Sequence, residues 1–105
     1  MLPAKLRIGH LDVSVQMMTE EESEEVGAGV ANPRTCTIKI DGRLDWQLQV
    51  ETLWHEVLHF IHFLADLGDE SKEEEFVART TPFHISFFRD NPEFRKVWAT
   101  ITEQP

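Results

Sequence analysis

The most informative stretch of the sequence is Trp54–His62, which reads W-H-E-V-L-H-F-I-H. Within it, His55, Glu56 and His59 form the pattern H-E-x-x-H. On an α-helix, residues four apart lie on one face with Cβ atoms roughly 5–6 Å apart, so two imidazoles can bind one zinc ion. Glu56 then flanks the ion, where its carboxylate can take a proton from a zinc-bound water. The pattern predicts a catalytic zinc site, and the alternative is an amphipathic helix with solvated histidines.

A long helix is predicted around this motif. Asp45 is a suitable N-cap, the periodicity continues to Leu67, and Gly68 provides a stop. More than half of the circumference is apolar, with Leu48, Val50, Leu53, Trp54, Val57, Leu58, Phe60, Ile61 and Leu64. Such a helix is expected to be buried on most sides. The remaining sector is polar and holds Thr52, His55, Glu56, His59 and His62. A bound metal would satisfy these groups.

A catalytic zinc site needs a third protein ligand besides a water. His62 is rejected because seven residues of helix separate it from His55 by about 10 Å along the axis. The run Glu73–Glu75 on the following helix is the better source, with Glu74 first because small residues share its side of the helix. Two other interpretations remain open. Glu74 can close a capping box with Ser71, and the run can simply favour the helix dipole.

The residues before the long helix are predicted to form a small, mainly antiparallel sheet. Residues 6–18 alternate apolar and polar side chains, and a change of phase at Gly9–His10 indicates a bulge or tight turn. His10 is expected to be a surface residue. The later half of this strand is expected to bury Leu11, Val13, Val15 and Met17. Residues 19–25 are acidic without apolar side chains, so a solvated loop is expected there.

Two further strands and two further helices are expected. Residues 26–31 indicate a short strand weakened by its glycines, and residues 35–41 a strand with an apolar face of Cys36, Ile38 and Ile40. A helix is predicted from about residue 71 to residue 89, with Pro82 expected to kink or divide it. Asp90-Asn91-Pro92 breaks the chain, and a short terminal helix begins at Pro92.

Composition limits the partners and the compartment. The 105 residues suit one domain, and a formal net charge of −9 argues against a nucleic-acid backbone or an anionic membrane as partner. The single cysteine excludes an intramolecular disulfide, and no signal peptide or membrane-spanning stretch is evident. A cytoplasmic protein is therefore expected, in the host cytoplasm if a phage encodes it.

Several short motifs support a family resemblance over residues 36–94. They read T-I-K-I-D, V-E-T-L-W-H-E-V-L-H, E-E-x-x-V and R-D-N-P-E-F. In these the chain resembles the small zincin-type metallopeptidase-like proteins encoded by bacteriophages, and more distantly the ImmA/IrrE-like and other gluzincins. The resemblance implies that a glutamate opening an E-x-x-A segment is the third zinc ligand. That segment corresponds to Glu74–Val77, which favours Glu74. The resemblance also implies an edge strand able to hold an extended peptide beside the helix.

These observations predict an α+β single domain over residues 1–105, with the sheet followed by three helices. The expected function is zinc-dependent hydrolysis of a peptide or protein substrate. His55, His59 and Glu74 would bind zinc and Glu56 would be the base. The residue that stabilises the oxyanion is unassigned: His84 and His10 are the available histidines, and the favoured interpretation of His84 is an ordinary, partly buried residue. The alternatives are a zinc-stabilised, non-catalytic binding module and an acidic phage-type inhibitor of a host protein.

Overall fold

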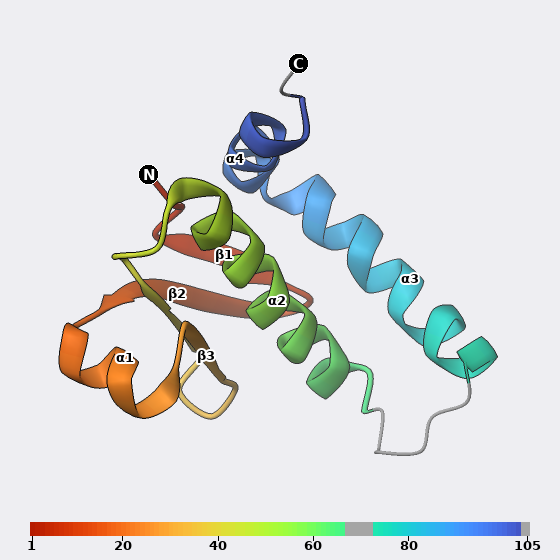
Figure 1. Cartoon of the computed structure of the whole chain (residues 1–105). Coiled ribbons are helices and arrows are strands. Elements are labelled where there is room, and N and C mark those ends of the chain that lie inside the picture. The colour runs from red at the N-terminus through yellow and green to blue at the C-terminus, as the bar shows by residue number, and fades with distance from the viewer. Residues whose placement is uncertain (67–72, 104–105) are drawn as a thin grey trace.

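The computed structural model describes residues 1–66 and 73–103, with side chains for residues 1–66 and 79–103. The fold is α+β, as predicted (Figure 1). Its elements are β1 Lys5–Ile8, β2 Leu11–Met18, α1 Glu20–Val26, β3 Gly29–Asn32, β4 Thr37–Asp41, α2 Trp46–Leu64, α3 Glu73–Asp90 and α4 Pro92–Thr102. None of the helices in the described residues combines the length and the apolar character needed to cross a membrane.

The four strands form one sheet in the order β1-β2-β4-β3. β1 pairs antiparallel with β2, and β3 pairs antiparallel with β4, which confirms a mainly antiparallel sheet. The central pair β2 and β4 is parallel, and α1 and β3 form the crossover connection that a parallel pair needs. β3 therefore becomes an edge strand, and α2 crosses one face of the sheet (Figure 1).

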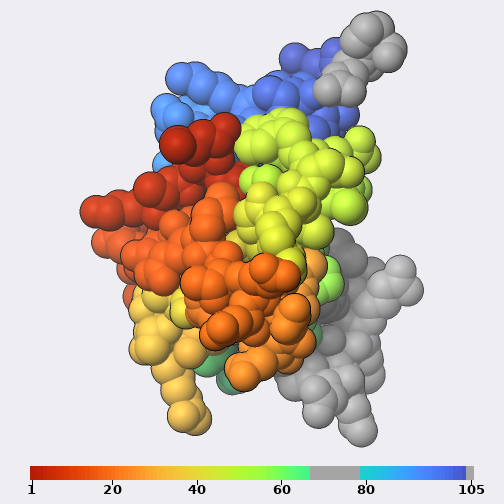
Figure 2. Space-filling model, turned by 60° about the vertical axis from the view of Figure 1, so that its left-hand side comes forward, coloured from red at the N-terminus to blue at the C-terminus, as the bar shows by residue number. Residues whose placement is uncertain are grey.

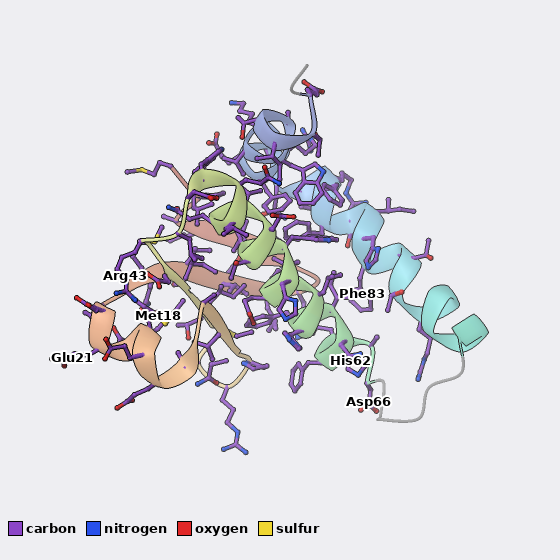
Figure 3. The ribbon with its side chains drawn as sticks, in the orientation of Figure 1. Met18, Glu21, Arg43, His62, Asp66 and Phe83 are labelled. Atoms are coloured by element: carbon purple, nitrogen blue, oxygen red, sulfur yellow. The ribbon has the colours of Figure 1, made fainter. Side chains whose placement is uncertain are left out.

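The predicted turn at Gly9 joins β1 and β2 and packs against two helices. Gly9 has a φ of +60°, a left-handed conformation that favours glycine. A Cβ atom there would lie 2.9 Å from Leu64 Cδ1 and 3.2 Å from Phe83 Cε1. Figure 3 shows Phe83 pointing from α3 toward α2. The turn thus needs glycine both for its backbone and for its contact with α2 and α3.

The end of β2 differs from the prediction. Met17 was expected to be buried but is 49% exposed, whereas Met18 is only 7% exposed. Met18 lies on the opposite face of the sheet, where Glu22 and Val26 of α1 line the same small hollow. The alternation of β2 did not reveal that a helix covers this second face.

The prediction of a loop over residues 19–25 is wrong, because these residues form α1 (orange in Figure 2). Thr19 caps the helix: its hydroxyl accepts from Glu22 N at 3.2 Å, and the Glu22 carboxylate accepts from Thr19 N at 3.1 Å. This capping box satisfies two free N–H groups, and the acidic first turn suits the helix dipole. Glu22 also pairs with Lys39 of β4 at 2.7 Å.

A buried carboxylate joins α1 to the end of β4. Ser23 Oγ donates to Asp41 Oδ2 at 2.6 Å, and Arg43 Nε donates to Asp41 Oδ1 at 3.1 Å. These hydrogen bonds, from Arg43 first and then Ser23, hold the pKa of Asp41 far below its ordinary value. Asp41 N also donates to Ala28 O at 2.9 Å, which anchors the chain just before the edge strand β3.

The two strands of the second hairpin are shorter than predicted. β3 covers Gly29–Asn32 instead of residues 26–31, and β4 begins at Thr37 instead of Thr35. Cys36 belongs to the turn between them and has a φ of +52°, so its predicted place on an apolar strand face is wrong. Ile38 and Ile40 are fully buried, as predicted. The turn residues Pro33–Cys36 account for the shift.

α2 packs one face on the sheet and exposes another. Its predicted N-cap is confirmed, because the Asp45 carboxylate accepts from Leu48 N at 2.9 Å. Helical structure ends at Leu64, and the predicted stop at Gly68 lies outside the described residues. The buried apolar positions are Val50, Leu53, Val57, Phe60 and Ile61. Leu48 is 47% exposed, and Trp54, Leu58 and Leu64 are only partly buried, so the prediction of a helix buried on most sides is too broad.

α3 runs back antiparallel to α2 and leads into α4 (Figure 1). Pro82 lies inside α3 without dividing it, and α4 begins at Pro92 as predicted. Trp54 of α2 connects the three helices: its ring centroid lies 5.6 Å from Phe87, 5.9 Å from Phe94 and 5.9 Å from Trp98. This aromatic cluster fixes the helices on the side of α2 away from β3.

Asn91, expected only to break the chain, connects the helices to the sheet. Its Oδ1 accepts from Arg7 N at 2.8 Å, and its Nδ2 donates to Arg7 O and to Phe87 O, both at 2.7 Å. Arg7 belongs to β1, whose outer edge has no neighbouring strand in the described sheet. The Asn91 amide thus takes the place of one strand residue at that edge.

We predict that Asn91→Ala lowers the free energy of unfolding by about 2–4 kcal/mol, because unsatisfied buried polar groups cost roughly 1–3 kcal/mol each. Urea denaturation of the variant and the wild type measures the difference. Asn32→Ala is the control, since Asn32 is exposed and its side chain accepts only from Arg34 N. Equal losses for the two variants would contradict the role assigned to Asn91.

Candidate metal centre

The three residues of the H-E-x-x-H pattern lie in the middle of α2. His55 and His59 are exposed, whereas Glu56 is only 5% exposed and points toward the sheet. Helix periodicity explains this division, because Glu56 follows the same buried stripe as Leu53, Val57 and Phe60. The histidines occupy the adjacent strip of surface. The helix packs on the sheet with its apolar face, so the two imidazoles lie at the surface and the Glu56 carboxylate lies buried next to them.

The two histidines are close enough to share a metal ion. Their Nε2 atoms lie 3.1 Å apart, and the ligand atoms of His55, Glu56 and His59 all lie within 4.8 Å of one another. Two nitrogens bound to a tetrahedral zinc at about 2.0–2.1 Å would be roughly 3.3–3.4 Å apart. The donor pair fits such an ion. The same distance also fits a hydrogen bond between one donor and one acceptor tautomer.

The environment of Glu56 alters its acidity. Burial raises the pKa of the Glu56 carboxyl above its ordinary value, and the charges of His59 and His55 offset part of that rise. The carboxyl group is thus buried beside two imidazoles, which is the position that the pattern requires of its base.

Gly29 of β3 provides the space beside Glu56, a role that was not predicted from the sequence. A Cβ atom at this position would lie 2.6 Å from Thr52 Cγ2 and 3.3 Å from Glu56 Oε2. Any larger residue would push β3 away from α2 or displace the carboxylate. The available signal was a glycine inside a predicted strand, which often marks a close approach of another segment. The edge strand and the motif helix thus meet at the candidate site.

One hollow of about 490 Å³ lies between α2 and α3 and adjoins the histidine pair. It contains four of the five histidines of the chain together with apolar and hydroxyl side chains; its lining is His55, Leu58, His59, Ile61, His62, Thr80 and His84. Only His84 among these histidines comes from α3. Its ring packs edge-on against Trp54, with the centroids 5.8 Å apart.

The other three histidines, His62, His10 and His84, lie at different distances from the motif. His62 lies outside the His55–Glu56–His59 cluster, toward the C-terminal end of α2 (Figure 3). His10 is exposed on the turn between β1 and β2. Between His84 and His10, the two histidines considered for oxyanion stabilisation, only His84 lines the hollow beside the motif.

The predicted third ligand, Glu74, lies outside the described side chains. Its backbone belongs to the first turn of α3, the helix that was expected to supply it. Thr80, six residues later and about 9 Å further along the axis, lines the hollow beside His55 and His59. The choice among Glu73, Glu74 and Glu75 therefore stays a prediction.

Comparison with known proteins finds no matching family model, no matching curated protein and no matching solved structure. The support for a metal site therefore comes from this chain alone. It consists of the distances among the ligand atoms of His55, Glu56 and His59, the burial of Glu56 and the close approach of β3 to α2.

We predict that the protein binds one zinc ion per chain. His55→Ala or His59→Ala should weaken zinc binding by at least about 100-fold, because losing a ligand costs more than losing a residue that only hydrogen-bonds to a ligand, which costs about 10- to 100-fold. His62→Ala is the matched control, since it removes an imidazole one turn away and should leave affinity nearly unchanged. Elemental analysis and chelator competition at neutral pH measure the binding. A wild-type protein that takes up no zinc would refute the site.

Proposed function

We propose that this protein is a zinc-dependent peptidase of the zincin type. His55, His59 and a glutamate from the first turn of α3 bind the metal, and Glu56 is the general base. One observation carries the proposal: two imidazole nitrogens 3.1 Å apart stand over a buried carboxylate, next to an edge strand. The motifs that resemble those of phage-encoded metallopeptidase-like proteins support the same conclusion.

A catalytic role for the metal is favoured over a structural one by the position of the histidines. Structural zinc sites are closed by four protein ligands and contribute directly to folding. His55 and His59 are exposed instead, and α2 already buries Val50, Leu53 and Phe60 against its neighbours. The core therefore does not need the ion, and the two ligands face open hollows that a substrate can enter.

Each group at the site has its own role in the proposed hydrolysis. Zinc, when bound, supplies a water of lowered pKa and a positive charge for the carbonyl oxygen. Glu56 accepts a proton from the attacking water and then delivers it to the nitrogen of the leaving amine. His84, which lines the α2–α3 hollow, donates a hydrogen bond to the carbonyl oxygen. β3 holds the substrate in an extended conformation along its free edge.

The third ligand is tested by comparing three neighbouring glutamates. Glu74→Gln should weaken zinc binding by at least about 100-fold, because a ligand is lost outright. Glu73→Gln and Glu75→Gln should change affinity little, although each removes the same charge from the same turn. Successive helix residues point about 100° apart, so only one of the three can face the histidine pair.

Chelator competition on these three variants separates the alternatives. A capping box predicts no change in zinc affinity for Glu74→Gln, because glutamine also serves at that position. Equal affinities in all three variants would refute the assignment of Glu74. A selective loss in the Glu75 variant would show that α3 is rotated from the predicted orientation.

The base is tested by Glu56→Gln. The amide cannot accept the proton of the water, so hydrolysis should fall by about 10²–10⁴-fold, the usual contribution of general-base catalysis. Zinc content should stay at the wild-type level, and circular dichroism should show an unchanged fold. A peptide-library assay analysed by mass spectrometry measures the cleavage.

Two results would change the proposal. If Glu56→Gln cleaves as fast as the wild type, Glu56 is not the base. If the zinc-loaded wild type cleaves nothing while still binding peptides, the protein is a zinc-containing binding module, and the Glu56 variant should then bind the same peptides.

A further inference from the structure

A second hollow, on the opposite side of the histidine pair from α3, lies between the beginning of β3 and the first half of α2. Its volume is about 460 Å³, and it is lined by Ala28, Gly29, Leu48, Glu51, Thr52, His55 and Glu56. His55 and Glu56 also belong to the candidate metal centre, so the hollow opens directly onto the site. A peptide lying along the edge of β3 would pass over it.

The charges of this hollow are of one sign. Glu51 is exposed, and among the described residues no hydrogen bond or ion pair involves its carboxylate. Glu56 contributes a second carboxyl group at the floor of the hollow. None of the described residues that line it is a lysine or an arginine. The whole chain also carries a net charge of −9, which attracts positively charged partners.

The apolar part of the lining suits a long cationic side chain. Leu48 lines the hollow and is 47% exposed, one helical turn before Glu51 and Thr52. Lysine and arginine bury their aliphatic stems on such surfaces and keep the charged head in water or on a carboxylate. An acidic side chain would instead meet Glu51 and Glu56, and a plain aliphatic one would leave Glu51 unpaired.

We infer that this hollow binds a lysine or arginine side chain of the peptide substrate, with Glu51 as the residue that recognises its charge. The inference rests on the proposed function, because it names the substrate class of that site. Glu51 precedes His55 by one helical turn, about 6 Å along the axis, which corresponds to roughly two residues of an extended peptide. The basic residue therefore lies within two positions of the bond that is cleaved.

The described lining of the hollow on the other side of the site lacks such a carboxylate. Between α2 and α3 it contains histidines and the apolar residues Leu58 and Ile61. The proposed function assigns Glu74 of α3 to the metal. Recognition by Glu51 therefore predicts a preference for a basic residue on the β3 side of the cleaved bond, whereas a general attraction between an acidic protein and a basic peptide predicts a preference at every position.

The test uses a positional-scanning peptide library in which each position carries lysine, norleucine or glutamate. The zinc-loaded wild type should prefer lysine over norleucine by about 2- to 5-fold at one position, as expected for an exposed ion pair. Glu51→Gln should abolish the preference, and Glu51→Lys should invert it toward glutamate. Glu21→Gln is the matched control, since it removes the same charge from exposed α1 (Figure 3) and should leave the preference intact.

The same library is also bound to zinc-loaded Glu56→Gln, with and without Glu51→Gln, to separate recognition from hydrolysis. A lysine preference in binding that disappears with Glu51→Gln supports the inference even if the wild type cleaves nothing, in which case the proposed hydrolysis alone fails. Cleavage without a lysine preference, or a preference unchanged by Glu51→Gln, overturns the inference and leaves the peptidase proposal standing. Equal weakening by Glu21→Gln and Glu51→Gln also overturns it, because only the net charge would then matter.

Discussion

The packing of α2 against the sheet is the contact on which the candidate site depends. Val50, Leu53, Val57 and Phe60 are fully buried along one stripe of the helix, so α2 cannot rotate without exposing them. This orientation turns Glu56 inward and His55 and His59 outward. It also brings α2 so close to β3 that only a glycine fits at position 29. The geometry of the site is thus a consequence of how the core is filled.

Because the core is complete without a metal ion, stability and the proposed chemistry use different parts of the molecule. The aromatic cluster around Trp54 and the Asn91 bridge to β1 hold the helices on the sheet. The Ser23–Asp41–Arg43 hydrogen bonds hold α1 and the start of β3. These contacts position the edge strand and the hollow beside Glu51, although none of them touches the histidine pair.

Local signals predicted the parts of the fold that depend on nearby residues. Asp45 caps α2, Gly9 makes the first turn, and Pro92 begins α4, because each rests on backbone chemistry within a few residues. The largest error, α1, also had a local signal in the capping box of Thr19 and Glu22. Residues 19–25 lack apolar side chains, which favoured the prediction of a loop. A short surface helix that is stabilised by a cap and ion pairs needs few apolar residues.

The placement of His55 beside His59 follows from the sequence alone, because helix periodicity places residues four apart on one face wherever the helix lies. The surroundings of the two histidines follow from the tertiary fold. The parallel pairing of β2 with β4 makes β3 an edge strand beside Glu56. The return of α3 brings His84 to the hollow of His55. Glu51 and Ala28 line one hollow although they are far apart in the chain. Such neighbours depend on packing between distant segments, which no local pattern encodes.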